Sequence, residues 1–92
     1  MPVNIYVYKT KEKIKHLCEG NWSLPNQVWE LESWLIKNYK SIPKGEYVAD
    51  IGFGIRKDAS GGGAVLSKDT MKIMSDIGMD LYLSEYPIKN VK

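Results

Sequence analysis

Hydrophobic and polar residues alternate in three stretches of the chain, and each stretch predicts a β-strand. They are Val3 to Lys9, Glu46 to Arg56 and Met79 to Tyr86. Alternation with a period of two, carried by β-branched and aromatic residues, is typical of a half-buried strand. A short apolar run, Gly63 to Leu66, predicts a further strand after the glycine-rich turn Lys57 to Gly62.

Apolar residues at helical spacing predict the remaining elements. The main helix is expected from Ser23 to Tyr39, where the apolar positions form one stripe. A second helix is expected from Ser67, as its N-cap, to Ile77, with Gly78 as the glycine that ends it. Thr10 to Glu19 has the spacing of a short helix, which would need packing to be stable.

The order of these elements predicts an α+β fold. It matches the ferredoxin-like βαββαβ two-layer sandwich, with the short helix as an optional addition before the first long helix. All 92 residues form a single domain, because a chain of this length has no room for a second core. Right-handed crossovers would put both long helices on one face of the sheet, which leaves the other face open.

This open face carries the candidate binding residues. Strand alternation places these residues on it: Asn4, Tyr6, Tyr8, Val48, Asp50, Arg56, Tyr82, Ser84 and Tyr86. Tyrosine combines a large rigid contact area with a polar tip, which suits interfaces. We therefore expect partner binding through Tyr6, Tyr8, Tyr82 and Tyr86, with Asp50 and Arg56 as orienting charges. Gly52 and Gly54 would leave space between the tyrosines.

Three questions about the surface stay open at this point. The segment Lys9 to Leu24 could fold across the open face and bury it, in which case its tyrosines belong to the core. A homodimer through the same face is another alternative. Trp29 and Ile36 lie seven residues apart beside the main stripe of the long helix, where we expect the short helix to cover them.

Composition and charge limit the class of protein and its partners. Hydrophobic residues make up 43 % and charged residues 26 % of the chain, which is typical of folded globular proteins. The net charge of +2 permits an acidic partner without indicating nucleic acid. Cys18 is the only cysteine, and the sequence has neither an apolar run long enough to cross a bilayer nor a secretory signal. We expect a cytoplasmic protein with no membrane partner.

The sequence lacks complete motifs for nucleotide binding, metal binding or catalysis. Five glycines lie between Gly52 and Gly63, but Lys57 stands where a dinucleotide-binding fingerprint needs its third glycine. His16 and Cys18 are too few for a structural zinc site, and only His16 could serve a catalytic triad. We therefore expect no cofactor, no metal and no enzymatic activity.

The block GEYVADIGFGIRKDASGGGAVLSKDTMKIMSDIGMDLYLSEYP, residues 45 to 87, resembles small bacterial α/β immunity proteins of toxin–immunity systems. The resemblance implies a non-enzymatic inhibitor that binds a toxin or defence effector, of immunity or anti-defence type. The alternative is single-stranded nucleic-acid binding, in which bases stack on the tyrosines of the open face.

Overall fold

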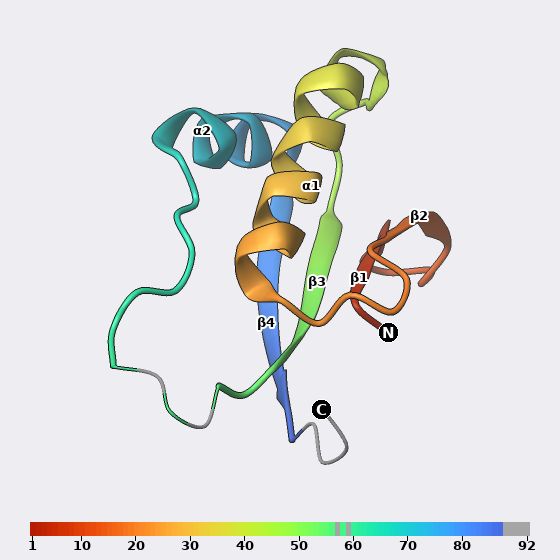
Figure 1. The fold of residues 1–92 in the computed structure, drawn as a ribbon. Coiled ribbons are helices and arrows are strands. Elements are labelled where there is room, and N and C mark those ends of the chain that lie inside the picture. The colour runs from red at the N-terminus through yellow and green to blue at the C-terminus, as the bar shows by residue number, and fades with distance from the viewer. Residues whose placement is uncertain (57, 59, 88–92) are drawn as a thin grey trace.

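The computed structural model describes residues 1–56, 58 and 60–87. Helices and a four-stranded sheet form two layers (Figure 1). The strands are β1 (Val3–Val7), β2 (Lys13–Leu17), β3 (Tyr47–Gly54) and β4 (Met79–Tyr86). The helices are α1 (Leu24–Asn38), the short 3-10 helix η1 (Tyr39–Ser41) and α2 (Lys68–Ile77).

The strand order across the sheet is β2-β1-β3-β4. β1 is antiparallel to both β2 and β3, whereas β3 and β4 are parallel and are connected through α2. The α+β class is therefore confirmed. The element order is ββαβαβ, so it differs from the ferredoxin-like βαββαβ order that the sequence predicted.

The short helix predicted at Thr10 to Glu19 is wrong, because its centre is strand β2. The chain turns back after β1, where the N–H of Val7 donates to the carbonyl of Glu12 and the N–H of Lys11 donates to Val7, both at 2.9 Å. Ile14 and Leu17 have helical spacing, but a helix of nine or ten residues is marginal. Pairing with β1 instead satisfies the backbone groups on the side of β2 that faces β1.

The strand predicted at Gly63 to Leu66 is also absent; these residues form an irregular connection. Gly61, Gly62 and Gly63 have φ angles of 114°, 79° and 123°, which are left-handed values that do not continue a strand. Val65 is 80 % exposed, so the apolar run has no core to join. The predicted turn Lys57 to Gly62 includes Lys57 and Ala59, which lie outside the described residues.

The core lies between the helices and one face of the sheet. The strand residues that enter it have odd numbers, as alternation requires. These residues form it: Val3, Ile5, Val28, Leu31, Leu35, Tyr47, Ala49, Ile51, Met74, Ile77 and Met79. Ser67 and Gly78 delimit α2 as predicted, since the Ser67 hydroxyl accepts the N–H of Thr70 at 3.1 Å and Gly78 adopts a φ of 87°.

Gln27 of α1 connects the helix layer to the end of the sheet. Its side chain is fully buried, and its Nε2 donates to the carbonyls of Gly52 at 2.7 Å and Asn21 at 2.8 Å. On the same edge of β3, the N–H of Gly52 donates to the Pro2 carbonyl just before β1 begins. The Gln27 amide therefore supplies a donor to the Gly52 carbonyl, because Pro2, which lies opposite Gly52, has no backbone N–H.

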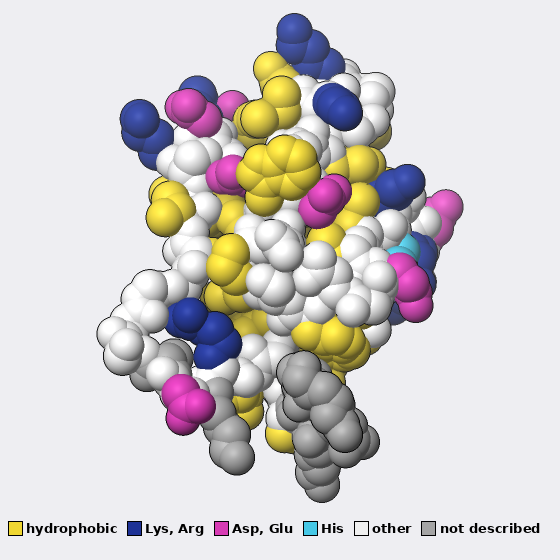
Figure 2. All heavy atoms as spheres, viewed as in Figure 1, with side chains coloured by type: hydrophobic (Ala, Val, Ile, Leu, Met, Phe, Trp, Pro, Cys, Tyr) yellow, Lys and Arg dark blue, Asp and Glu magenta, His cyan; other side chains and the backbone are white. Residues whose placement is uncertain are grey.

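Several apolar side chains predicted to be covered are exposed. Trp29 is 63 % and Ile36 is 62 % exposed on the outer side of α1, because the segment expected to cover them forms β2 instead. Figure 2 shows hydrophobic atoms along α1 on this side of the molecule. Leu83 belongs to the helix side of β4 by alternation but is 59 % exposed. Only the first residue of β4, Met79, is buried. None of the described helices is long and apolar enough to cross a membrane.

Candidate functional site

The open face of the sheet is the side opposite α1 and α2 (Figure 1). The residues with even numbers in β1, β3 and β4 form it, and none of them belongs to the core cluster. His16 of β2 joins it opposite Asn4. Val48 lies there between Tyr6 and Asp80 and is fully buried. Neighbouring side chains of the face therefore exclude water from its centre.

The segment Lys9 to Leu24 does not fold across this face. Its central part, β2, pairs with β1 in the plane of the sheet and extends the face by one strand. Tyr82 is consequently 40 % exposed and Tyr8 is 46 % exposed, whereas Tyr6 is half-buried. The tyrosines thus form a partly exposed aromatic surface.

Asp50 lies at the middle of the face and is held in place. In register it lies between Asn4 of β1 and Tyr82 of β4. The Ser84 hydroxyl donates to its Oδ1 at 2.7 Å. Burial raises the pKa of the Tyr6 phenol, and the nearby negative charge of Asp50 raises it further. The charges of Asp50 and Tyr82 therefore both act on the Tyr6 phenol.

Lys11 covers one side of this group from the β1–β2 turn. Its Nζ lies 4.8 Å from the centre of the Tyr8 ring and 5.6 Å from that of Tyr6, both within the range of cation–π contacts. Lys11 has a φ of 64°, an uncommon conformation for a residue other than glycine. Tyr6 and Tyr8 are thus brought together as predicted, with a cation between them that the sequence did not predict.

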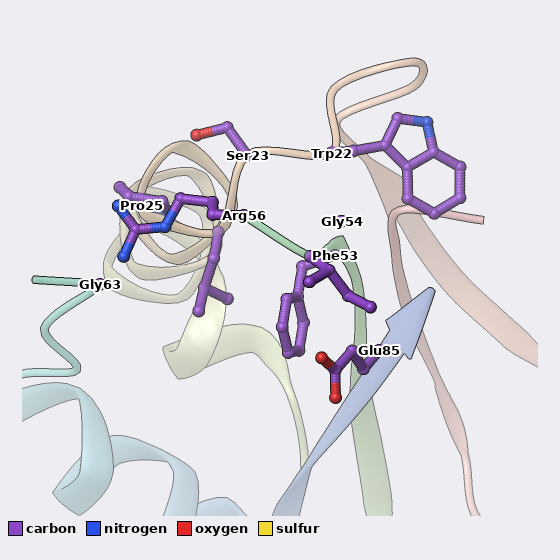
Figure 3. Close-up of a pocket in the computed structure, with 10 residues that line it drawn as sticks. Trp22, Ser23, Pro25, Phe53, Gly54, Arg56, Gly63 and Glu85 are labelled. Carbon is purple, nitrogen blue, oxygen red and sulfur yellow. The ribbon is translucent and has the colours of Figure 1, made fainter. Parts of the chain in front are cut away.

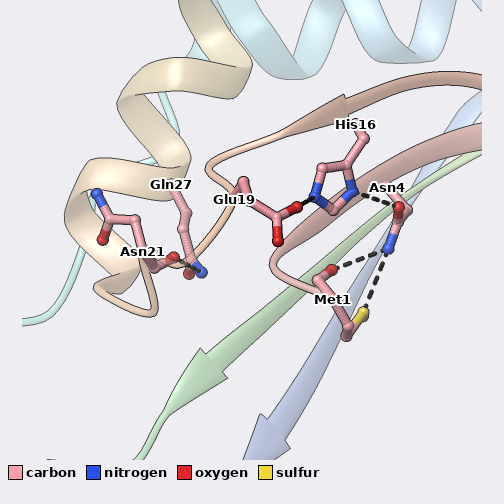
Figure 4. Close-up of polar contacts among 6 residues, drawn as sticks. All are labelled: Met1, Asn4, His16, Glu19, Asn21 and Gln27. Carbon is pink, nitrogen blue, oxygen red and sulfur yellow. Dashed lines mark hydrogen bonds and ion pairs between the residues drawn. The ribbon is translucent and has the colours of Figure 1, made fainter.

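A chain of polar contacts crosses β1 and β2 beside these tyrosines (Figure 4). Asn4 donates through Nδ2 to the Met1 carbonyl at 2.8 Å, so its Oδ1 is free to accept from Nδ1 of His16, also at 2.8 Å. The other ring nitrogen of His16 lies 2.8 Å from a carboxylate oxygen of Glu19. This chain fixes the orientation of the His16 ring.

Tyr86 lies at the far end of the face and is 37 % exposed. The space predicted above Gly52 is filled: a Cβ there would meet the Tyr86 ring at 3.0 Å and the Met1 side chain at 3.1 Å. The Trp22 ring packs edge-on against Tyr86 with their centres 5.6 Å apart. The gap expected between tyrosines is therefore absent at Gly52.

Arg56 is not on the open face, contrary to prediction. β3 ends at Gly54, so the alternation that assigned Arg56 to that face no longer applies. Its Nη2 donates to the Gly61 carbonyl at 3.0 Å. Arg56 instead lines a pocket of about 340 Å³ with Pro25 at the start of α1 and Phe53 of β3 (Figure 3). Arg56 and Asp50 therefore do not lie together on the open face.

Among the described residues, no group of three or more His, Cys, Asp or Glu side chains is arranged to hold a metal ion. Comparison with known proteins gives no match: no family model fits the chain, and no curated protein or solved structure is significantly similar to it.

Proposed function

We propose that the protein is a non-enzymatic protein-binding module that inhibits a partner by occluding its active site. The partner is a toxin or a defence effector, as for an inhibitor of immunity or anti-defence type that acts in the cytoplasm. The observation that carries the proposal is the partly exposed aromatic surface of the open face, on which Asp50 lies between Asn4 and Tyr82 in register and near Tyr6. Rigid aromatic area around an oriented charge is typical of interface anchors.

The arrangement of charge favours a protein over a nucleic acid. Asp50 and Asp80 lie on the open face between or beside the tyrosines that bases would stack upon. Two carboxylates at those positions repel a phosphate backbone. The lysines of this region lie at the β2 side of the face, where Lys11 already contacts Tyr6 and Tyr8 and Lys13 lies opposite Tyr6 in register. Single-stranded nucleic-acid binding therefore remains the second candidate.

A pair of matched variants tests the proposal. The purified chain is used to capture a partner from its host, and binding is then measured with the isolated partner. Tyr82→Ala removes an exposed tyrosine of the open face, and Trp29→Ala removes an exposed aromatic residue from the opposite side of the molecule. We expect Tyr82→Ala to weaken binding at least about tenfold, as for interface anchors. Trp29→Ala should leave binding unchanged.

Inhibition and salt dependence complete the test. The wild-type chain should abolish the partner's activity at equimolar ratio, and Tyr82→Ala should require an excess. Equal binding by Tyr82→Ala and wild type would contradict the proposed surface. Steep loss of binding between low and moderate salt, with a nucleic acid as the captured ligand, would establish the second candidate instead.

A further inference from the structure

The two edges of the sheet differ in how they are protected. β2 is five residues long, its pairing with β1 is irregular between Ile5 and Tyr6, and Lys13 and Lys15 are exposed on it. Short length, bulges and lysines are the usual devices that prevent an edge strand from pairing with another chain. β4, at the other edge, is eight residues long, contains no lysine and pairs in unbroken register with β3. Pro87 follows β4 and therefore does not interrupt it.

The backbone of β4 has free hydrogen-bonding groups along this edge. The N–H of Tyr47 donates to Gly78 and that of Ile55 donates to Tyr86 at the two ends of the β3–β4 pair. Because parallel pairing repeats every two residues, the even-numbered residues of β4 point their backbone groups at β3. The backbone N–H and C=O groups of Leu81, Leu83 and Glu85 point away from β3. Within the described part of the chain, no hydrogen bond to these groups is found.

Apolar side chains of β4 are exposed on both sides of this free edge. Leu83 is 59 % exposed on the helix side and Tyr82 is 40 % exposed on the open face. An exposed, regular and apolar edge strand is a template for strand addition. The surface therefore fits an extended backbone that also brings apolar side chains.

We propose that this backbone is β4 of a second copy of the chain. The two strands pair antiparallel about a twofold axis at Tyr82, which joins the two sheets into one. The sequence of β4 is self-complementary in this register. Leu81 lies opposite Leu83 of the second copy, so the most exposed of the large apolar residues of the strand is buried against an apolar partner. Tyr82 pairs with its own copy.

Charge agrees with this register. Asp80 lies opposite Ser84 of the second copy, and Glu85 lies opposite Met79 of the second copy. Like charges directly opposite each other would destabilise the pair, and this register has none. The alternative register centred on Leu83 would pair Leu83 with its own copy, but it would place Leu81 opposite Glu85, an apolar side chain opposite a charged one. The proposed dimer goes beyond the proposed function, since it is formed by the edge of the sheet; Tyr82 is the residue that this edge shares with the open face.

Sedimentation equilibrium of the whole chain from micromolar to millimolar concentration tests the dimer. The wild type should rise from a mass of 10.5 kDa toward twice that value. Leu83→Lys places a charge within the proposed contact and should remain monomeric throughout. Ile36→Lys is the matched control, because Ile36 is 62 % exposed on α1 and lies outside the edge. This variant should dimerise like the wild type, and circular dichroism should show that both variants are folded.

Amide hydrogen exchange identifies the edge independently. The amides of Tyr82 and Ser84 should be protected at every concentration, because they bond to β3. Those of Leu81 and Leu83 should gain protection only as the concentration rises. A chain that is monomeric at every concentration overturns the proposal, and so does a dimer that survives Leu83→Lys. Partner binding by monomeric Leu83→Lys would separate the dimer from the proposed function.

Discussion

Glu32 of α1 and Thr70 of α2 are joined by a 2.9 Å hydrogen bond from the Thr70 hydroxyl to the Glu32 carboxylate. The same carboxylate oxygen accepts the backbone N–H of Ser67, also at 2.9 Å. The pKa of Glu32 is lowered, chiefly by the hydrogen bond from the Ser67 N–H, with desolvation acting in the opposite direction. A carboxylate of one helix thus caps the start of the next, where the helix dipole favours negative charge.

Glu32→Gln should destabilise the fold at neutral pH by about 1 kcal/mol, because hydrogen bonds to a charged acceptor are lost at a half-buried position. The pKa of Glu32 in the folded state lies below the unfolded value of 4.5, so at a pH between these two values the unfolded chain binds more protons than the folded one. The stabilisation is therefore complete above the unfolded pKa and disappears as the pH falls through the folded pKa. Urea unfolding of the wild type and the variant at several pH values measures this difference.

The control is Glu30→Gln, on an exposed position of the same helix. It should leave the free energy of unfolding nearly unchanged at all pH values. A Glu32→Gln effect that persists unchanged into acid would show that packing, and not the charged hydrogen bonds, holds the helices together.

This contact illustrates which parts of α2 the sequence could predict. Ser67 as N-cap and Gly78 as terminal glycine were predicted correctly, because both follow from residues within a few positions of the helix end. Glu32 is 35 residues from Ser67 and has no local pattern that distinguishes it from Glu30. Contacts of this kind depend on how the helices are placed on the sheet, which periodicity does not determine.

Gly78→Ala should destabilise the protein by more than about 2 kcal/mol. Gly78 has a φ of 87°, and a Cβ there would overlap the carbonyl oxygen of Gly45. Gly20→Ala is the matched control: its φ is 77°, but a Cβ would meet nothing within 4 Å. This variant carries backbone strain alone and should cost about 1 kcal/mol. Thermal or urea unfolding compares them, and equal losses would mean that the Gly45 contact relaxes freely.

Gln27→Leu should destabilise the protein by about 1 kcal/mol, since the buried carbonyl of Gly52 loses its donor. Within the described residues the Gln27 Oε1 is buried without a partner, so removing it offsets part of the loss. Asn26→Leu, an exposed change on the same helix turn, should be nearly neutral. Urea unfolding of both variants checks this. A Gln27→Leu protein as stable as the wild type would show that the hydrogen bonds of the Gln27 side chain make no net contribution to the free energy of unfolding.

The open face was predicted correctly where strands are regular and wrongly where they end. Alternation placed Tyr6, Asp50 and Tyr82 on one face, because a period of two is a local property of a strand. It failed for Arg56, which lies beyond the last residue of β3. It also did not reveal Lys11, whose contact with the tyrosines depends on a hairpin that the sequence pattern predicted as a helix.

Asp50→Asn should lower the pKa of the Tyr6 phenol. Burial and the charge of Asp50 raise that pKa above its ordinary value of 10.0, and the substitution removes only the second cause. Because the folded-state pKa is the higher one, Tyr6 stabilises the fold fully below pH 10.0, and this contribution is lost as the pH rises through the folded pKa.

NMR measures the change in the Tyr6 pKa directly: Asp50→Asn should shift the Tyr6 ring signals to a lower titration midpoint. Tyr6→Phe identifies those signals by their loss and should flatten the alkaline fall in stability. A midpoint unchanged by Asp50→Asn would mean that the charge of Asp50 on β3 does not act on Tyr6 of β1.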